Sequence, residues 1–132
     1  MADTAITSIT WDDNAVTSIS AAVGTAIVSG DVHVITPTGP LENMVILVRN
    51  TEGSTNTVTV KAGSTTAGAA AQSAGLGDFV SAAIAATTGM IVLPPLESAR
   101  FLQANGTIRV AVEAGMTGYI IALQKPTVTA GV

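Results

Sequence analysis

The chain has 132 residues, of which 48% are hydrophobic and only 11% charged, and its net charge is −4. This is the length of one domain with a single core, and the five lysine and arginine residues are too few and too scattered to neutralise a row of phosphates, so we expect no nucleic-acid binding. The lack of cysteine excludes disulfides and thiolate metal sites, and the scarcity of aromatic residues means that the core must be aliphatic.

The N-terminal segment, residues 1–28, is rich in Ala, Thr and Ser, and its apolar residues follow no regular spacing. Two interpretations stay open. The segment is either an arm that packs on a neighbouring protein or one or two edge strands that complete a sheet. Ile6, Ile9 and Trp11 are its candidate interface residues. The start of the chain has neither the basic nor the apolar region of a secretory signal, so we do not expect secretion by that route.

Further along the chain, alternating or continuous apolar residues predict short strands. In chain order these strands cover residues 31–35, 44–49, 57–61, 90–93, 107–113 and 118–123. The segment at 44–49 is apolar on both faces, which predicts a central strand that is covered on both sides. In the segment at 107–113 the apolar side chains are predicted to point inward, whereas Arg109 and Glu113 point outward.

Turn residues separate these strands at intervals of about ten residues, as in β-sandwiches and jelly rolls. Residues 37–40 have the sequence Pro-Thr-Gly-Pro, and Asn105-Gly106 is a strong hairpin signal. We therefore predict an all-β fold, a jelly-roll-like β-sandwich over residues 29–126, followed by a C-terminal tail over residues 127–132.

Two segments depart from the strand pattern. Residues 96–101 favour one helical turn, because Pro95 suits the start of a helix. Residues 62–77 are small, uncharged and Gly-rich, and we expect a long loop there, which in a compact domain is functional or mobile. This loop has no Gly-Lys-Ser/Thr element and so does not support a nucleotide site.

Two stretches, residues 14–30 and residues 79–96, carry no charge, and each approaches the length of a membrane-spanning helix. The second contains Gly89 and Pro94-Pro95, and both are rich in Ser, Thr, Ala and Gly rather than Leu. Such clusters separate strands more often than they lie in lipid, so we expect no membrane partner.

The sequence offers few groups for catalysis or metal binding. His33 is the single histidine, lies in a predicted strand and is expected to be structural rather than a general base. Asp12-Asp13-Asn14 provides oxygen ligands but lacks the spacing of a calcium loop, and a solvated turn explains it. We therefore expect no enzyme activity, no cofactor and no metal site.

Four charged residues complete the set of candidate interface residues. Glu97 and Arg100 are three positions apart and meet if their segment is helical. Arg109 and Glu113 share the outer face of one predicted strand. On a solvated face an ion pair contributes about 0–1 kcal/mol, whereas in an assembly the same groups set specificity and register.

Several short motifs together resemble a known family. They are Arg-Asn-Thr at 49–51, Thr-Val-Thr-Val-Lys-Ala-Gly at 57–63, Leu-Glu-Ser-Ala-Arg-Phe at 96–101, Asn-Gly-Thr-Ile at 105–108 and Ala-Gly-Met-Thr-Gly at 114–118. Over about residues 41–126 the chain is similar to the capsid decoration, or cement, proteins of tailed bacteriophages. Residues 1–40 show no such similarity.

The resemblance implies a non-enzymatic virion protein that binds the outer surface of the capsid and stabilises the shell. Its expected partners are the major capsid protein and further copies of itself, arranged as a homotrimer. It would assemble in the host cytoplasm and be located on the capsid exterior. Two alternatives stay open: a tail, collar or fibre-base component, and a carbohydrate-binding β-sandwich module, for which the chain has few aromatic residues.

Overall fold

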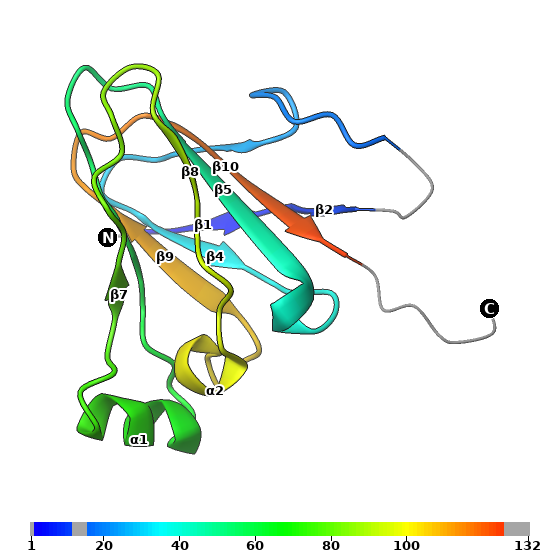
Figure 1. Ribbon diagram of the computed structural model, residues 1–132, viewed down its shortest axis with the longest axis vertical. Coiled ribbons are helices and arrows are strands. Elements are labelled where there is room, and N and C mark those ends of the chain that lie inside the picture. Colours follow the sequence, from blue (N-terminus) through cyan, green and yellow to red (C-terminus); the bar gives the residue numbers. More distant parts are fainter. Residues whose placement is uncertain (1, 12–15, 126–132) are drawn as a thin grey trace.

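The structure is a computed structural model that describes residues 2–11 and 16–125. Its regular structure is mostly strand, arranged as two facing sheets, which confirms the predicted all-β sandwich (Figure 1). The strands are β1 (Asp3–Ile6), β2 (Ser8–Thr10), β3 (Thr25–Ala26), β4 (Val32–Ile35), β5 (Met44–Asn50), β6 (Val58–Val60), β7 (Phe79–Val80), β8 (Met90–Val92), β9 (Ile108–Val112) and β10 (Gly118–Gln124). The helical elements are the 3₁₀ turn η1 (Leu41–Asn43) and the helices α1 (Thr66–Ser73) and α2 (Ser98–Phe101).

Each sheet has five strands, and we call them sheet A and sheet B. Sheet A has the order β1-β4-β9-β6-β7. Sheet B has the order β2-β10-β5-β8, and β3 also pairs with β10. From β4 to β10 the chain changes sheet at every connection except that from β6 to β7. The central ladders therefore join segments that are distant in the sequence, such as β4 with β9 and β5 with β10.

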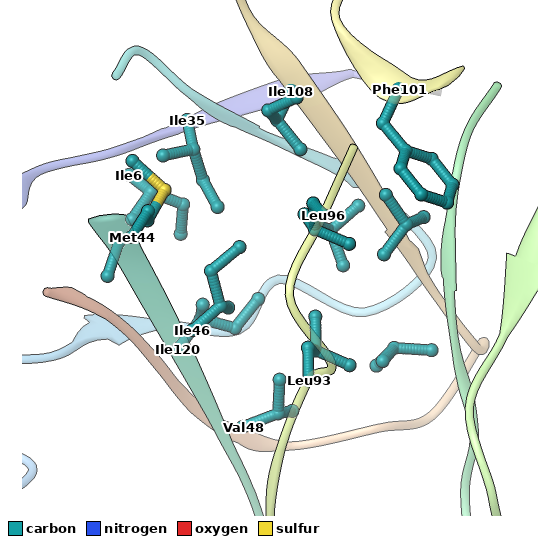
Figure 2. Packing of buried hydrophobic residues seen from close by; sticks show 14 of the residues in the cluster. Ile6, Ile35, Met44, Ile46, Val48, Leu93, Leu96, Phe101, Ile108 and Ile120 are labelled. Carbon is teal, nitrogen blue, oxygen red and sulfur yellow. The ribbon is translucent and has the colours of Figure 1, made fainter. Parts of the chain in front are cut away.

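The core between the sheets is largely aliphatic (Figure 2). Val58 and Val60 of β6 and Ile108 and Val110 of β9 are fully buried, and for β9 this confirms the predicted inward positions. Full burial of one such side chain contributes about 1.5–3 kcal/mol relative to leaving it exposed. The helical turn predicted over residues 96–101 is present as α2. Its Phe101 side chain is buried and packs at one end of the core.

Strand β5 is covered on both faces, as its continuous apolar sequence predicts. Ile46 and Val48 face the core, whereas Leu47 belongs to a second cluster on the outer face of sheet B, together with Ile121 and Leu123 of β10. We call this second group the outer cluster. An apolar run without alternation thus marks a strand that is packed from both sides.

The N-terminal segment supplies edge strands. β1 runs parallel to β4 with Ile6 opposite Ile35, and β2 runs parallel to β10. Of the two interpretations of residues 1–28, the structure therefore supports edge strands of the sandwich. The Asp-Asp-Asn cluster at 12–14 and the predicted tail at 127–132 lie outside the described residues.

The predicted loop at 62–77 instead contains the helix α1, so the expectation of a continuous loop is wrong. The Thr65 hydroxyl accepts a hydrogen bond from the Gly68 N–H at 3.1 Å and caps the start of the helix. Four alanines within the helix favour the helical state, which the glycine content of the segment had obscured.

Asn105-Gly106 forms a turn, but this turn joins α2 to β9 and does not connect two paired strands. Gly106 has φ +82°, and the Asn105 side-chain oxygen accepts hydrogen bonds from the backbone and hydroxyl of Thr107. The dipeptide therefore identified a turn correctly, while its hairpin interpretation is wrong because the preceding segment is helical.

Candidate functional site: two apolar surfaces

The apolar interface candidates from the sequence lie in different environments. Ile6 is 5% exposed and belongs to the core, so it is not available to a partner in the folded chain, and its selection as an interface residue is corrected. Ile9 is half-buried and packs against the outer cluster. Trp11 is exposed, and its backbone N–H donates to the carbonyl of Gln124 at 2.9 Å, which fixes the end of β2 beside β10.

Glu97 and Arg100 do not meet. The Arg100 Nε–H donates to the Gly77 carbonyl at 3.0 Å, and its guanidinium lies 4.6 Å from the centre of the Phe101 ring. Glu97 is exposed immediately before α2, and the ion pairs of the described residues do not include it. Arg100 thus secures the segment between α1 and β7 rather than presenting its charge freely.

Arg109 and Glu113 also make contacts within the chain. Arg109 donates two hydrogen bonds to the carboxylate of Asp3, at 2.9 and 3.0 Å, and this guanidinium holds the pKa of Asp3 below its usual value. The Glu113 carboxylate accepts a hydrogen bond from the backbone N–H of Thr57 at 2.9 Å. These charges connect β9 to β1 and to the start of β6, which is a structural use within one chain.

Most exposed large apolar side chains of the described residues belong to two surfaces. The first, which we call the N-terminal surface, consists of Val16, Ile19, Val23 and Val28. The second, which we call the β8 edge, consists of Val80, Met90 and Val92. Trp11 and Leu76 are exposed outside both. The extremes are Val16, which is 98% exposed, and Val92, which is 60% exposed.

The N-terminal surface lies on the irregular segments on either side of β3, with Val16, Ile19 and Val23 before this strand and Val28 after it. The N–H groups of Val23 and Gly24 both donate to the Ser20 carbonyl, which forms a turn. A Cβ atom at Gly24 would lie only 2.8 Å from the Tyr119 ring, so glycine allows this turn to approach the outer face of sheet B closely. The segment therefore packs on β10 while Val16 and Ile19 remain exposed.

At the β8 edge the end strand of sheet A, β7, lies near the end strand of sheet B, β8, because residues of both line one groove. A groove of about 340 Å³ lies between them. It is lined by Phe79, Ser81, Ala82, Ile91, Val92, Leu93 and Pro94. The groove is therefore formed mainly by apolar side chains from a stretch without charge.

The open side of β8 also presents backbone groups. The Gly89 carbonyl accepts from Asn50 at 2.8 Å, and the Leu93 N–H donates to Ile46 at 2.9 Å, so these alternate residues bond to β5. In an antiparallel ladder the residues between them point the other way. Met90 and Val92 consequently direct their N–H and C=O groups away from β5.

The strands next to the two surfaces, β3 and β8, lie at opposite margins of sheet B. β3, which lies between Val23 and Val28 of the N-terminal surface, pairs with β10 on the side away from β5, whereas β8 pairs with β5 on the side away from β10. A protein with this arrangement can contact two neighbours at once.

Sequence reasoning missed the residues of both surfaces, although a signal for them was present. With residues 14–30 and 79–96, the two uncharged stretches contain all seven of these side chains. The candidate residues chosen from residues 1–28, Ile6, Ile9 and Trp11, all lie before the first of these stretches. In a β-sandwich a lack of charge marks surface segments on which apolar residues are not interrupted by charged ones.

His33 is fully buried in β4, and its Nε2 atom accepts a hydrogen bond from the Val28 N–H at 3.0 Å. Burial lowers the pKa of His33, and the negative charge of Asp31 opposes this effect only in part. The imidazole is therefore a neutral structural acceptor that fixes the segment after β3, consistent with its expected structural role.

A second hollow has a volume of about 430 Å³ and is open to solvent. It is lined by Ser64, Gln103, Ala104, Asn105 and Arg109. The charge of Arg109 is already neutralised by Asp3, and Gln103 donates to the Ala62 carbonyl at 2.9 Å. These groups serve the surrounding loops, and the hollow does not assemble a set of free catalytic side chains.

Within the described residues there is no cluster of three side chains suited to metal binding, and no helix there has the length and apolar character needed to cross a membrane. Comparisons of the chain with family models, with curated proteins and with solved structures find no match.

Proposed function

We propose that this chain is a non-enzymatic structural protein of a tailed-bacteriophage virion, which binds the outer surface of the capsid and stabilises the shell. The observation that carries the proposal is the pair of apolar surfaces next to β3 and β8, at opposite margins of sheet B. A protein that reinforces a shell has to hold neighbouring subunits together, and two separated contact surfaces provide this by making attachment multivalent.

We also propose that the β-sandwich is a jelly roll, and the pairing of its strands supports this. Of the eight strands from β3 to β10, the first pairs with the eighth and the second with the seventh. The third pairs with the eighth and sixth, and the fourth with the seventh and fifth, all antiparallel. The eight strands of a jelly roll, which form two Greek keys, pair in this way. β1 and β2 are then additional parallel strands at the margins of the jelly roll.

The distribution of charge supports a role in an assembly. Asp3, Asp78 and Arg109 take part in ion pairs within the chain, and neither apolar surface contains a charged residue. Contact between such surfaces and a partner removes apolar area from water without the desolvation of ions. The proposed partners are the major capsid protein and further copies of this chain, at the capsid exterior after assembly in the host cytoplasm.

The test is a count of the chain in purified particles, by density-gradient fractionation and quantitative peptide detection. Hundreds of copies per particle would support decoration. A handful would favour a tail, collar or fibre-base component, and absence from particles would overturn a virion role.

A variant sharpens the count. We expect the double substitution Val16→Lys and Ile19→Lys to lower the copy number, because it places charge on the N-terminal surface. Leu76→Lys introduces the same charge at an exposed apolar residue outside both surfaces and serves as the matched control. Equal copy numbers for the two variants would show that the N-terminal surface does not contact the shell.

Carbohydrate binding is the second candidate function, and exposed Trp11 is the observation that favours it. Aromatic rings at a surface stack on sugars, but a single ring provides a small platform. Binding to a glycan array that is lost on Trp11→Ala would establish this function in place of the first.

A further inference from the structure

We propose that β8 is a self-association strand, which pairs antiparallel with β8 of a second copy of this chain and so extends sheet B across a two-fold axis. This inference goes beyond the proposed function and does not depend on it. It concerns what the purified chain does alone.

The backbone of β8 points to a strand as its partner. Met90 and Val92 direct two N–H and two C=O groups toward the open side, because the intervening residues bond to β5. An edge of this kind is a template for another strand. Loops and helices would leave several of these four groups without a partner.

The register of such a pair identifies a second copy as a suitable occupant. When two β8 strands pair about Ile91, Met90 of each copy lies opposite Val92 of the other. In this register all four outward groups of each strand form hydrogen bonds, since the bonded positions of one copy meet the bonded positions of the other. The arrangement is self-complementary, as a two-fold contact must be.

The side chains agree with this register. Met90 and Val92 are 39% and 60% exposed and lie on the same face of β8, so the pair brings each methionine beside a valine. Val92 lies next to Leu47 of β5, which belongs to the outer cluster. Pairing would therefore extend an existing apolar face from one copy into the next.

The lack of charge at this edge favours contact between two copies. Each copy carries a net charge of −4, so two copies repel one another in general. The stretch at 79–96 has no charge, and contact there brings no like charges together. Arg49 of β5 lies beside Met90, and the two Arg49 residues of such a pair are at least three strand spacings apart, or at least about 14 Å, which exceeds the screening length of about 8 Å at physiological salt.

The contact is short, so we expect weak association with a dissociation constant on the order of 10 μM to 1 mM. The full chain is studied by light scattering and sedimentation over this concentration range. The expected mass rises from that of one chain, 13.1 kDa, toward twice this value. A protein that stays monomeric overturns the proposal. A mass of three chains also overturns the two-fold pair and favours the homotrimer that the family resemblance implies.

Substitutions locate the contact. Val92→Lys and Met90→Lys each place a charge on the β8 edge, and we expect each to raise the dissociation constant at least tenfold. Leu76→Lys is the matched control, at a residue of similar exposure, 53%, and is expected to associate like the unchanged chain. Circular dichroism checks that all variants fold. Folded β8 variants that associate normally overturn the assignment of this strand.

Amide exchange tests the register. In the monomer the Ile91 N–H is held by β5, whereas those of Met90 and Val92 face solvent. We expect the amides of Met90 and Val92 to become protected at high concentration only, and that of Ile91 to be protected throughout. Fast exchange of Met90 and Val92 in the associated state overturns strand pairing. These measurements use no capsid, so their failure is separate from absence of the chain from virions.

Discussion

In both β9 and β8 successive side chains point to opposite faces of the strand, but the two strands differ in burial. The alternate apolar side chains Ile108, Val110 and Val112 of β9 are buried, whereas Met90 and Val92 of β8 are exposed. β9 lies inside sheet A between β4 and β6; its valines face the core and its outward Arg109 is bound by Asp3. β8 lies at the margin of sheet B; only Ile91 faces the core, and Met90 and Val92 face outward without a covering element. Folding thus buries the inward apolar residues of β9 and leaves two of the three apolar residues of β8 exposed. Apolar side chains that stay exposed after folding are the ones available to a partner.

The largest expected effect separates the two strands directly. Val110→Asp in β9 places an unpaired charge in the core, and we expect a loss of at least about 4 kcal/mol, enough to prevent folding. Val92→Asp in β8 introduces the same group at an exposed position and is expected to fold. Soluble yield and thermal unfolding by circular dichroism measure both. A soluble Val110→Asp protein with an unchanged melting temperature would mean that the register of β9 is wrong.

A smaller expected change in stability tests whether β1 is packed against the core or only loosely attached to the surface. Ile6 is 5% exposed, so Ile6→Ala should cost about 2–4 kcal/mol through lost burial and the cavity left behind. Val80→Ala, at a residue that is 57% exposed, should change stability by less than about 0.5 kcal/mol. Urea unfolding measures both values. Similarly small changes in stability for the two variants would show that β1 is an arm that contributes little to the core.

The pH dependence of stability probes the buried face of β4, next to β9. Burial lowers the pKa of His33 in the folded chain, so below about pH 6.5 the unfolded chain binds a proton that the folded chain does not. Stability is then fully present above this pH and falls as the pH decreases, with a slope of at most about 1.4 kcal/mol per pH unit. His33→Gln keeps an acceptor for the Val28 N–H and cannot titrate. Urea unfolding between pH 7 and about pH 5 should show a flatter profile for this variant, and identical profiles would contradict the role given to His33.

The smallest effect concerns the outward side of β9. Asp3→Asn removes the charge that binds Arg109, but Asp3 is exposed, so we expect a slight decrease in melting temperature. The decrease should disappear in about 1 M salt, which screens exposed charges. A large decrease that persists in salt would show that this ion pair, rather than burial, holds β1 in place.

Local patterns identified much of the fold. The inward residues of β9, the two-sided burial of β5 and the helical turn at α2 were all predicted, because each depends on neighbours within a few residues. α1 was missed because the glycines around it have low helix propensity, whereas the cap from Thr65 and the alanines decide its conformation. Of the interface candidates, Ile6 was misplaced because irregular spacing hid the inward face of a four-residue strand.

By itself, the sequence determined the all-β class, an aliphatic core and the positions of most strands, since the period of two is a local property of the chain. Only the tertiary structure decided which strands pair. The ladders of β4 with β9 and of β5 with β10 join segments that are far apart along the chain, and no short pattern encodes such partners. Pairing also decided that β8, which was predicted only as a short strand, lies at a margin with Met90 and Val92 exposed. The physical reason is that alternation defines the two faces of a strand, while burial of either face depends on what the rest of the chain places against it.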